Sequence, residues 1–268
     1  MPENSRVIVA DRVKEQQSPS RFLRAYSVVW WLSFAFFTVL LFTWSVILLP
    51  TLIFDRRGAY LHVGTVCVWG WSVFGLNPFW SIKVDGREKL PKHERGLFVA
   101  NHESSADILA MGAIFRPFKF VSKKSNFSIP VLGWAMRLNG HIELQRGSRE
   151  SILRMLADCR RHLENESPIV MFPEGTRSSD GQIKQFKTGA FQLAMETNSP
   201  VYPIVLAGTR DTLPKHGLIC PLRAHVRIKV LDPVFPSDFE SIETLTYHVR
   251  AMMVAEKAKL NDLLAAIR

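Results

Sequence analysis

LFVANHESSADIL, residues 97 to 109, joins an apolar run to a polar loop and then to the start of an apolar helix. The run LFVA predicts a strand that ends at Asn101, and a helix is expected to begin near Ser104 or Ser105. Serine is a favoured helix-capping residue, so we expect these two serines to supply the cap. A strand that leads through a short loop into a helix is the repeating unit of α/β proteins.

The same alternation of short apolar runs and amphipathic helices continues to the end of the chain. The pattern predicts strands at 81–85, 97–100, 119–122, 141–144, 169–172, 201–206 and 225–231, and helices at 105–114, 131–138, 149–165, 189–197 and 242–265. It therefore indicates an α/β fold with a mixed, mostly parallel sheet flanked by helices. Functional side chains are expected where strands run out into loops.

The N-terminal third of the chain has a different character. Residues 1–20 form a polar tail, and residues 25–54 contain no charged residue. This run exceeds the roughly 20 residues that cross a bilayer and is too long for a signal peptide. A second apolar stretch follows over 59–80, so we predict a membrane-embedded helical hairpin over 21–80. Arginines lie on both sides of the first stretch, which leaves open whether the hairpin spans the bilayer or dips into one leaflet.

Composition narrows the class of partner. The formal net charge is +10, which favours polyanionic partners. Many of the aromatic residues crowd into the first 80 positions instead of alternating with Lys and Arg, and this favours a membrane over nucleic acid. The cysteines, Cys67, Cys159 and Cys220, form no C-x-x-C pair, so neither a zinc site nor a disulfide framework is indicated.

His102 and Asp107 are the candidate catalytic pair in the opening stretch. With the histidine in the loop and the aspartate in the first helical turn, the carboxylate can reach an imidazole nitrogen and leave the other nitrogen as a general base. A zinc motif H-E-x-x-H would need a histidine at position 106, where the chain has Ala106. No G-x-S-x-G nucleophile elbow occurs. From these residues alone, a catalytic pair and a capped structural loop both stay possible.

Cations follow three of the other predicted strands. In IVMFPEGTRS, residues 169 to 178, Gly175 allows backbone N–H groups to face a ligand, and Arg177 offers a two-pronged phosphate contact. The alternative is an ordinary loop with a solvated arginine. Lys123 and Lys124 follow the strand in KFVSKKSNFSIPVLGW, and Arg146 follows the strand in GHIELQRG. Together they indicate an anion site.

The ordered set NHESSAD, VSKKSNFSIPVLGW, GHIELQRG, FPEGTRS with FKTGAF, and VYPIVLAGT resembles the four-block signature of the glycerophospholipid acyltransferases. It is most similar to that of bacterial 1-acylglycerol-3-phosphate acyltransferases, and the likeness runs from about residue 80 to 209. The resemblance implies that His102 is the catalytic base of an H-x4-D motif and that Asp107 is its partner. It also implies that residues 81–268 form the acyltransferase domain, including a C-terminal amphipathic helix.

The resemblance also assigns binding roles. Glu174, Gly175, Thr176 and Arg177 fall in the block that binds the glycerol phosphate acceptor, with Lys123 and Arg146 as further phosphate contacts and Pro203 in the block associated with the acyl donor. The chain departs from the family pattern at Glu103, where Gln is common, and at Leu144, Gln145 and Arg146, where Ile-Asp-Arg is common. These departures bear on the acceptor subtype and on the role of Arg146.

The implied reaction moves a fatty acyl group from acyl-CoA or acyl carrier protein to the free hydroxyl of lysophosphatidic acid. The product is phosphatidic acid, and no metal or redox cofactor is expected. Another lysophospholipid, a lyso-aminolipid or glycerol 3-phosphate remains an alternative acceptor, and a non-catalytic anionic-lipid binding protein is a remote alternative. The resemblance implies a bacterial inner membrane location with the catalytic domain on the cytoplasmic side.

Overall fold

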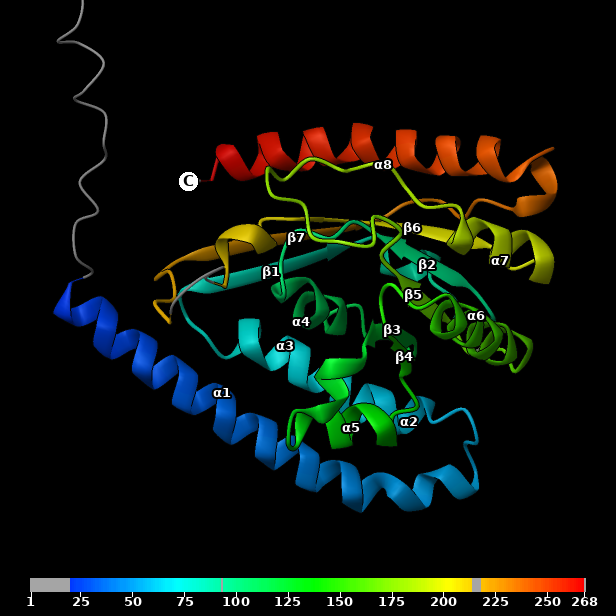
Figure 1. Cartoon of the computed structure of the whole chain (residues 1–268). Coiled ribbons are helices and arrows are strands. Elements are labelled where there is room, and N and C mark those ends of the chain that lie inside the picture. Colours follow the sequence, from blue (N-terminus) through cyan, green and yellow to red (C-terminus); the bar gives the residue numbers. More distant parts are fainter. Residues whose placement is uncertain (1–19, 93, 214–217, 268) are drawn as a thin grey trace, which may run out of the picture.

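The protein has a central seven-stranded sheet with helices on both faces (Figure 1). The computed structural model describes residues 20–92, 94–213 and 218–267, so the predicted polar tail falls outside the described residues except for Ser20. The strand order is β1-β7-β6-β2-β5-β3-β4, and every pair is parallel except β6 with β7. The predicted fold class is therefore confirmed. The strands are β1 (Trp80–Asp85), β2 (Leu97–Ala100), β3 (Lys119–Lys123), β4 (Ile142–Leu144), β5 (Ile169–Met171), β6 (Val201–Ala207) and β7 (Ala224–Val230).

Each sheet face is covered by its own set of helices, because the central strands are apolar at every position. In β2, Leu97 and Val99 pack toward α6, α7 and α8, whereas Phe98 and Ala100 pack toward α3 and α4. All four side chains are buried, as expected for a parallel strand covered on both faces. The helices are α1 (Arg21–Leu48), α2 (Ala59–His62), α3 (Val68–Gly75), α4 (Ala106–Gly112), α5 (Leu132–Leu138), α6 (Arg149–Glu164), α7 (Gly189–Thr197) and α8 (Ile242–Ala265).

Short helical turns complete the chain. A π-helical turn joins α2 to α3, and 3₁₀ turns follow α1 and several of the strands. These turns are η1 (Leu49–Ile53), η2 (the π turn, Val63–Cys67), η3 (Arg87–Lys89), η4 (Lys124–Ser128), η5 (Thr209–Asp211) and η6 (Pro236–Asp238).

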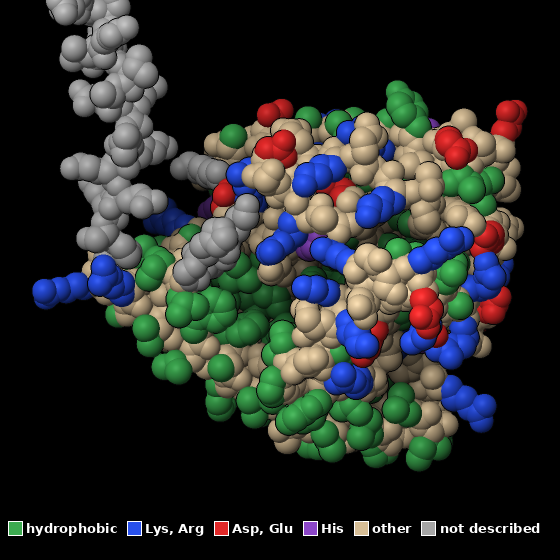
Figure 2. Space-filling view, in the orientation of Figure 1, with side chains coloured by type: hydrophobic (Ala, Val, Ile, Leu, Met, Phe, Trp, Pro, Cys, Tyr) green, Lys and Arg blue, Asp and Glu red, His purple; other side chains and the backbone are tan. Residues whose placement is uncertain are grey.

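The N-terminal helix α1 lies along one side of the molecule with an apolar outer face (Figures 1 and 2). Within the described residues, Arg21–Ile53 is the one helical stretch that is long and apolar enough to cross a membrane; its best window has a mean hydropathy of 2.3 and is 6% buried. Outward-facing residues such as Phe22, Leu32 and Phe36 are more than 60% exposed. A helix this apolar on its exposed face requires an apolar environment.

The second apolar stretch turns back from the end of α1 as α2, the π turn and α3. It packs between α1 and α4, and Leu61, Cys67 and Phe74 are buried. This half of the predicted hairpin therefore contributes buried side chains to the protein core. The helix α4, which carries Asp107, rests directly on it.

Gly70 of α3 and Gly112 of α4 allow these two helices to come very close. A Cβ atom on Gly70 would lie 2.3 Å from the Leu109 carbonyl oxygen and 3.0 Å from the Gly112 Cα atom. Because these neighbours are backbone atoms, Gly70→Ala must push α3 and α4 apart. We expect it to lower the free energy of unfolding by about 1–3 kcal/mol.

Thermal unfolding in detergent measures this loss. Gly189→Ala is the matched control, since a Cβ atom there meets nothing within 4 Å. Equal melting temperatures for the two variants would contradict the close packing of α3 on α4.

Candidate active site

His102 and Asp107 meet at the carboxyl end of β2. His102 Nδ1 lies 2.7 Å from Asp107 Oδ2, so the predicted contact forms. The His102 side chain keeps 13% of its surface exposed, whereas Asp107 is fully buried. An aspartate at Nδ1 holds the imidazole orientation and leaves Nε2 for a substrate.

Asp107 also organises the loop that holds His102. The same Oδ2 atom accepts hydrogen bonds from the Glu103 N–H at 2.7 Å and the Ser104 N–H at 2.9 Å. Ser104 Oγ accepts a bond from the Ala106 N–H, whereas Ser105, within the described chain, makes no capping bond. The expectation that both serines cap α4 is therefore wrong for Ser105. The loop curls around the Asp107 carboxylate instead, because a charged acceptor in the first turn binds free N–H groups strongly.

The loop after β5, residues 173–178, forms hydrogen bonds with both the N–H and the carbonyl of His102. The His102 N–H donates to Glu174 Oε1 at 2.8 Å, and the His102 carbonyl accepts from the Ser178 N–H at 2.7 Å. The second oxygen of Glu174 accepts from the Lys184 N–H at 3.1 Å. Burial raises the pKa of Glu174, and the two N–H donors oppose that rise. The Glu174 carboxylate is thus turned toward backbone and fixes the position of His102.

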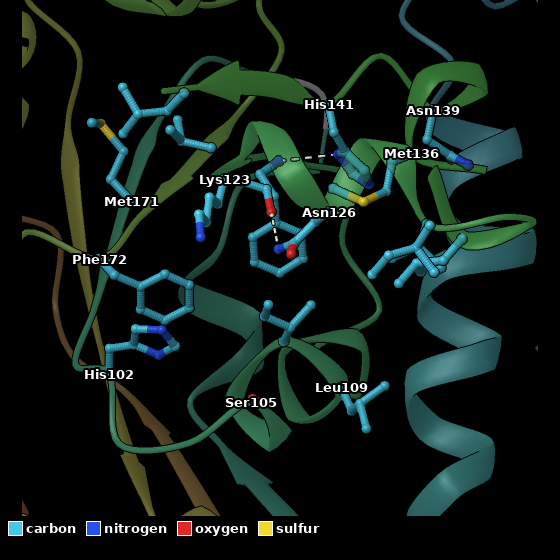
Figure 3. Close-up of a pocket in the computed structure, with 18 of the residues that line it drawn as sticks. His102, Ser105, Leu109, Lys123, Asn126, Met136, Asn139, His141, Met171 and Phe172 are labelled. Carbon is cyan, nitrogen blue, oxygen red and sulfur yellow. Dashed lines mark hydrogen bonds between the residues drawn. The ribbon is translucent and has the colours of Figure 1, made fainter. Parts of the chain in front are cut away.

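Phe172 holds the imidazole ring from one side (Figure 3). The two rings are stacked with centroids 4.4 Å apart and an angle of 25° between their planes. Phe172 lies directly after β5, which runs parallel to β2, so the two strand ends present the two rings side by side. In the sequence Phe172 is the first residue of FPEGTRS, but nothing in that motif indicates that its ring stacks on His102.

His102 lies on the wall of a cavity of about 780 Å³. One part of the wall is apolar and lies between α1 and α5, and another part carries cations. The apolar part includes Trp31, Phe34, Leu41, Phe42, Leu132, Ala135 and Met136. The cations are Lys123, Arg146 and Lys187. In Figure 2 a recess with hydrophobic side chains lies between α1 and the part of the surface where Lys and Arg gather.

Known proteins share both the sequence and the fold. The family profile described as Acyltransferase matches residues 81–207. A 1-acyl-sn-glycerol-3-phosphate acyltransferase of Salmonella typhimurium is 30% identical over 200 residues, which cover 72% of this chain and 80% of the relative. The chain belongs to the acyltransferase family.

Another relative and a solved structure extend this comparison. A 1-acyl-sn-glycerol-3-phosphate acyltransferase of Chlamydomonas reinhardtii is 43% identical over 145 residues, or 54% of this chain and 44% of that protein. The chain thus spans about half the length of such relatives. The crystal structure of the 1-acyl-sn-glycerophosphate acyltransferase PlsC from Thermotoga maritima matches with a TM-score of 0.77 and 25% identity, covering 89% of this chain and 98% of that one.

Only some of the binding residues predicted from the sequence meet at the cavity. Lys123, Arg146, Gly175 and Thr176 line it together with His102. The described residues of the cavity wall do not include Glu174, Arg177 or Pro203. Arg177 is exposed, and its Nη1 atom donates to Ser105 Oγ at 2.9 Å. Ser105 itself lines the cavity, so Arg177 lies next to the cavity wall.

Pro203 lies inside the sheet. It is buried in β6, paired in register with Val99 of β2, and its carbonyl accepts a hydrogen bond from the Leu231 N–H. The expectation that Pro203 contacts a substrate is not met by this position. Its ring instead lies within β6, the neighbour of β2, and His102 follows the end of β2.

Lys187 lines the cavity although the motifs did not single it out. Gly175 has a φ of +70°, and a Cβ atom there would lie 2.9 Å from Lys187 Nζ, so the lysine lies over the glycine. The available signal was the position of Lys187 in FKTGAF, two residues before α7, in a block already associated with the acceptor. Among the residues that the structure describes, the cavity wall therefore presents three cations to an anionic substrate.

Proposed function

We propose that the protein transfers a fatty acyl group from an acyl thioester to the free hydroxyl of 1-acylglycerol 3-phosphate, which gives phosphatidic acid. The observation that carries this proposal is the single cavity that combines the His102–Asp107 pair, a long apolar wall and three cations. An acceptor with a phosphate, a hydroxyl and an acyl chain matches these three features. The names of the relatives support the same reaction.

The chemical step follows from the orientation of His102. Nε2 removes the proton from the acceptor hydroxyl, and the oxygen attacks the thioester carbonyl. The tetrahedral intermediate collapses with cleavage of the C–S bond, and the imidazolium returns its proton to the departing thiolate. Asp107 stabilises the imidazolium through its bond to Nδ1. The reaction balances without a metal or a redox cofactor.

The membrane supplies the lipid substrates in this proposal. α1 exposes apolar side chains on its outer face, while Trp31, Phe34 and Leu41 of the same helix line the cavity. One helix thus separates the cavity from the hydrocarbon region, so a lysolipid reaches the site without leaving an apolar environment. We place the α/β domain on the cytoplasmic face of a bacterial inner membrane, where acidic donors, acyl-CoA or acyl carrier protein, are attracted to its basic surface.

An acceptor panel tests the proposal. Membranes that contain the protein are supplied with acyl-CoA or acyl carrier protein thioester and with lysophosphatidic acid, a lysophosphatidylcholine, a lyso-aminolipid or glycerol 3-phosphate. We expect fastest turnover with lysophosphatidic acid. Faster turnover of an acceptor that lacks the phosphomonoester would overturn the proposed acceptor class.

Arg146→Ala tests the cationic part of the cavity. A charge-assisted contact to phosphate contributes about 1.5–3 kcal/mol, so we expect the apparent KM for lysophosphatidic acid to rise about tenfold or more. The value of kcat should change much less, because the contact binds the acceptor and not the reacting atoms. Arg149→Ala is the control, since Arg149 is exposed at the start of α6. An unchanged KM for Arg146→Ala would remove this residue from the phosphate site.

A further inference from the structure

Glu103, the residue after His102, forms a buried ion pair with Lys257 of α8. The two side chains keep only 4% and 5% of their surfaces exposed. On α8, Lys257 falls among Val249, Met253 and Leu260, all of which are buried, so a cation interrupts the apolar stripe of this helix. Such a placement is costly unless the charge is fully paired, which points to a specific role for the lysine.

The pair belongs to a hydrogen-bonded network at the carboxyl ends of β2 and β6. Lys257 Nζ also donates to the Leu206 carbonyl at 2.7 Å, and Asn101 Nδ2 donates to Glu103 Oε1 at 3.2 Å and to the same carbonyl at 3.0 Å. Asn101 Oδ1 accepts from the Leu206 N–H at 2.8 Å. The network therefore ties the residues on both sides of His102 to β6 and to α8.

The same loop is bound to the catalytic aspartate. The Glu103 N–H donates to Asp107 Oδ2, the atom that also contacts His102. The Glu103 backbone is thus held on one side by Asp107, while its side chain is held on the other by Lys257. A shift of Glu103 would move the donor to Asp107 and the peptide that follows His102.

The Lys257 ammonium partly compensates the negative charges around Glu103. Burial raises the pKa of Glu103, and the Lys257 ammonium lowers it again, while the nearby Asp107 and Glu174 carboxylates raise it. Three carboxylates therefore surround the His102 loop, and Lys257 supplies a buried positive charge among them.

We propose that Lys257, acting through Glu103, is a positioning residue that holds the catalytic loop in its reactive geometry. This rests on the proposed acyl transfer. It gives the C-terminal helix a part in turnover, although α8 packs on the sheet face opposite to α4. A displacement of about 1 Å in a catalytic group can cost about 10²-fold in rate.

Glu103→Met and Lys257→Met test the proposal with the acceptor that the wild-type protein turns over fastest. We expect kcat to fall about 10- to 100-fold with KM for both substrates within about twofold, because the network orients the base and does not touch substrate. Lys259→Met is the matched control, since Lys259 lies on the same helix and pairs with Glu256 at the surface. It should keep the wild-type kcat.

A double variant, Glu103→Met with Lys257→Met, separates positioning from folding. Replacing a buried ion pair with apolar side chains of similar volume is often neutral for stability, so we expect a near wild-type melting temperature in detergent. The value of kcat should stay low, because Asn101 loses its bond to Glu103 and α8 no longer holds the loop. Wild-type kcat in the double variant would overturn the positioning role. Absence of turnover of every acceptor by the wild-type protein would instead overturn the proposed function and this inference with it.

Discussion

His102→Ala is expected to reduce acyl transfer by about 10²–10⁴-fold or more, the range that a positioned general base contributes. The imidazole is the group of the Asp107 pair that reaches the cavity, and its removal leaves the acceptor hydroxyl without a proton acceptor. The loop itself should persist, because its N–H bonds go to Asp107. Turnover is measured as phosphatidic acid formed in membranes with matched amounts of protein.

The control for this variant is His248→Ala. His248 is exposed on α8 and contacts the Phe239 ring. We expect normal turnover for His248→Ala and unchanged membrane association for both variants. A His102→Ala protein with near-normal turnover would exclude His102 as the base.

Asp107→Asn is expected to lower kcat by roughly 10²–10⁴-fold while the protein remains folded. The carboxamide oxygen can still accept the Glu103 and Ser104 N–H bonds, but it carries no charge to stabilise the imidazolium. The change therefore separates the electrostatic role of Asp107 from its role in the loop. Measurements of kcat and of the melting temperature on the same sample distinguish the two.

Asp158→Asn serves as the comparison for Asp107→Asn. Asp158 lies on α6 and pairs with Arg161 at the surface. We expect both variants to melt close to the wild-type temperature and only Asp107→Asn to lose activity. Equal activity in the two variants would show that the carboxylate charge at 107 is dispensable.

Local sequence patterns were sufficient to predict the strands and most helices of the α/β domain. α7 and α8 begin and end where the pattern predicts, because their apolar periods are clear and polar residues flank them. The order of the strands in the sheet depends on contacts between distant segments, and the local pattern does not encode it. The same holds for the contact of α3 with α4, because the two helices come from separate segments and no local pattern pairs them.

Within the site, the sequence could predict contacts between residues that lie close together along the chain. The His102–Asp107 contact is of this kind, since five positions separate the two residues. The partners of Glu103 and Glu174 were not predictable, because Lys257 and the His102 main chain come from distant segments. Glu174 was expected to bind the acceptor, and Glu103 had no assigned role. In the structure both residues bind the loop that carries His102.

The most direct test of the account is a single-turnover experiment with a thioester that carries a labelled acyl group. The protein is mixed with the labelled donor, quenched with acid, and examined for label on the chain and in lipid, before and after lysophosphatidic acid is added. Direct attack by a hydroxyl that His102 deprotonates predicts an unlabelled chain throughout and labelled phosphatidic acid only after the acceptor is added. Label bound covalently to the chain before the acceptor is added, and then passed to lipid, would contradict it.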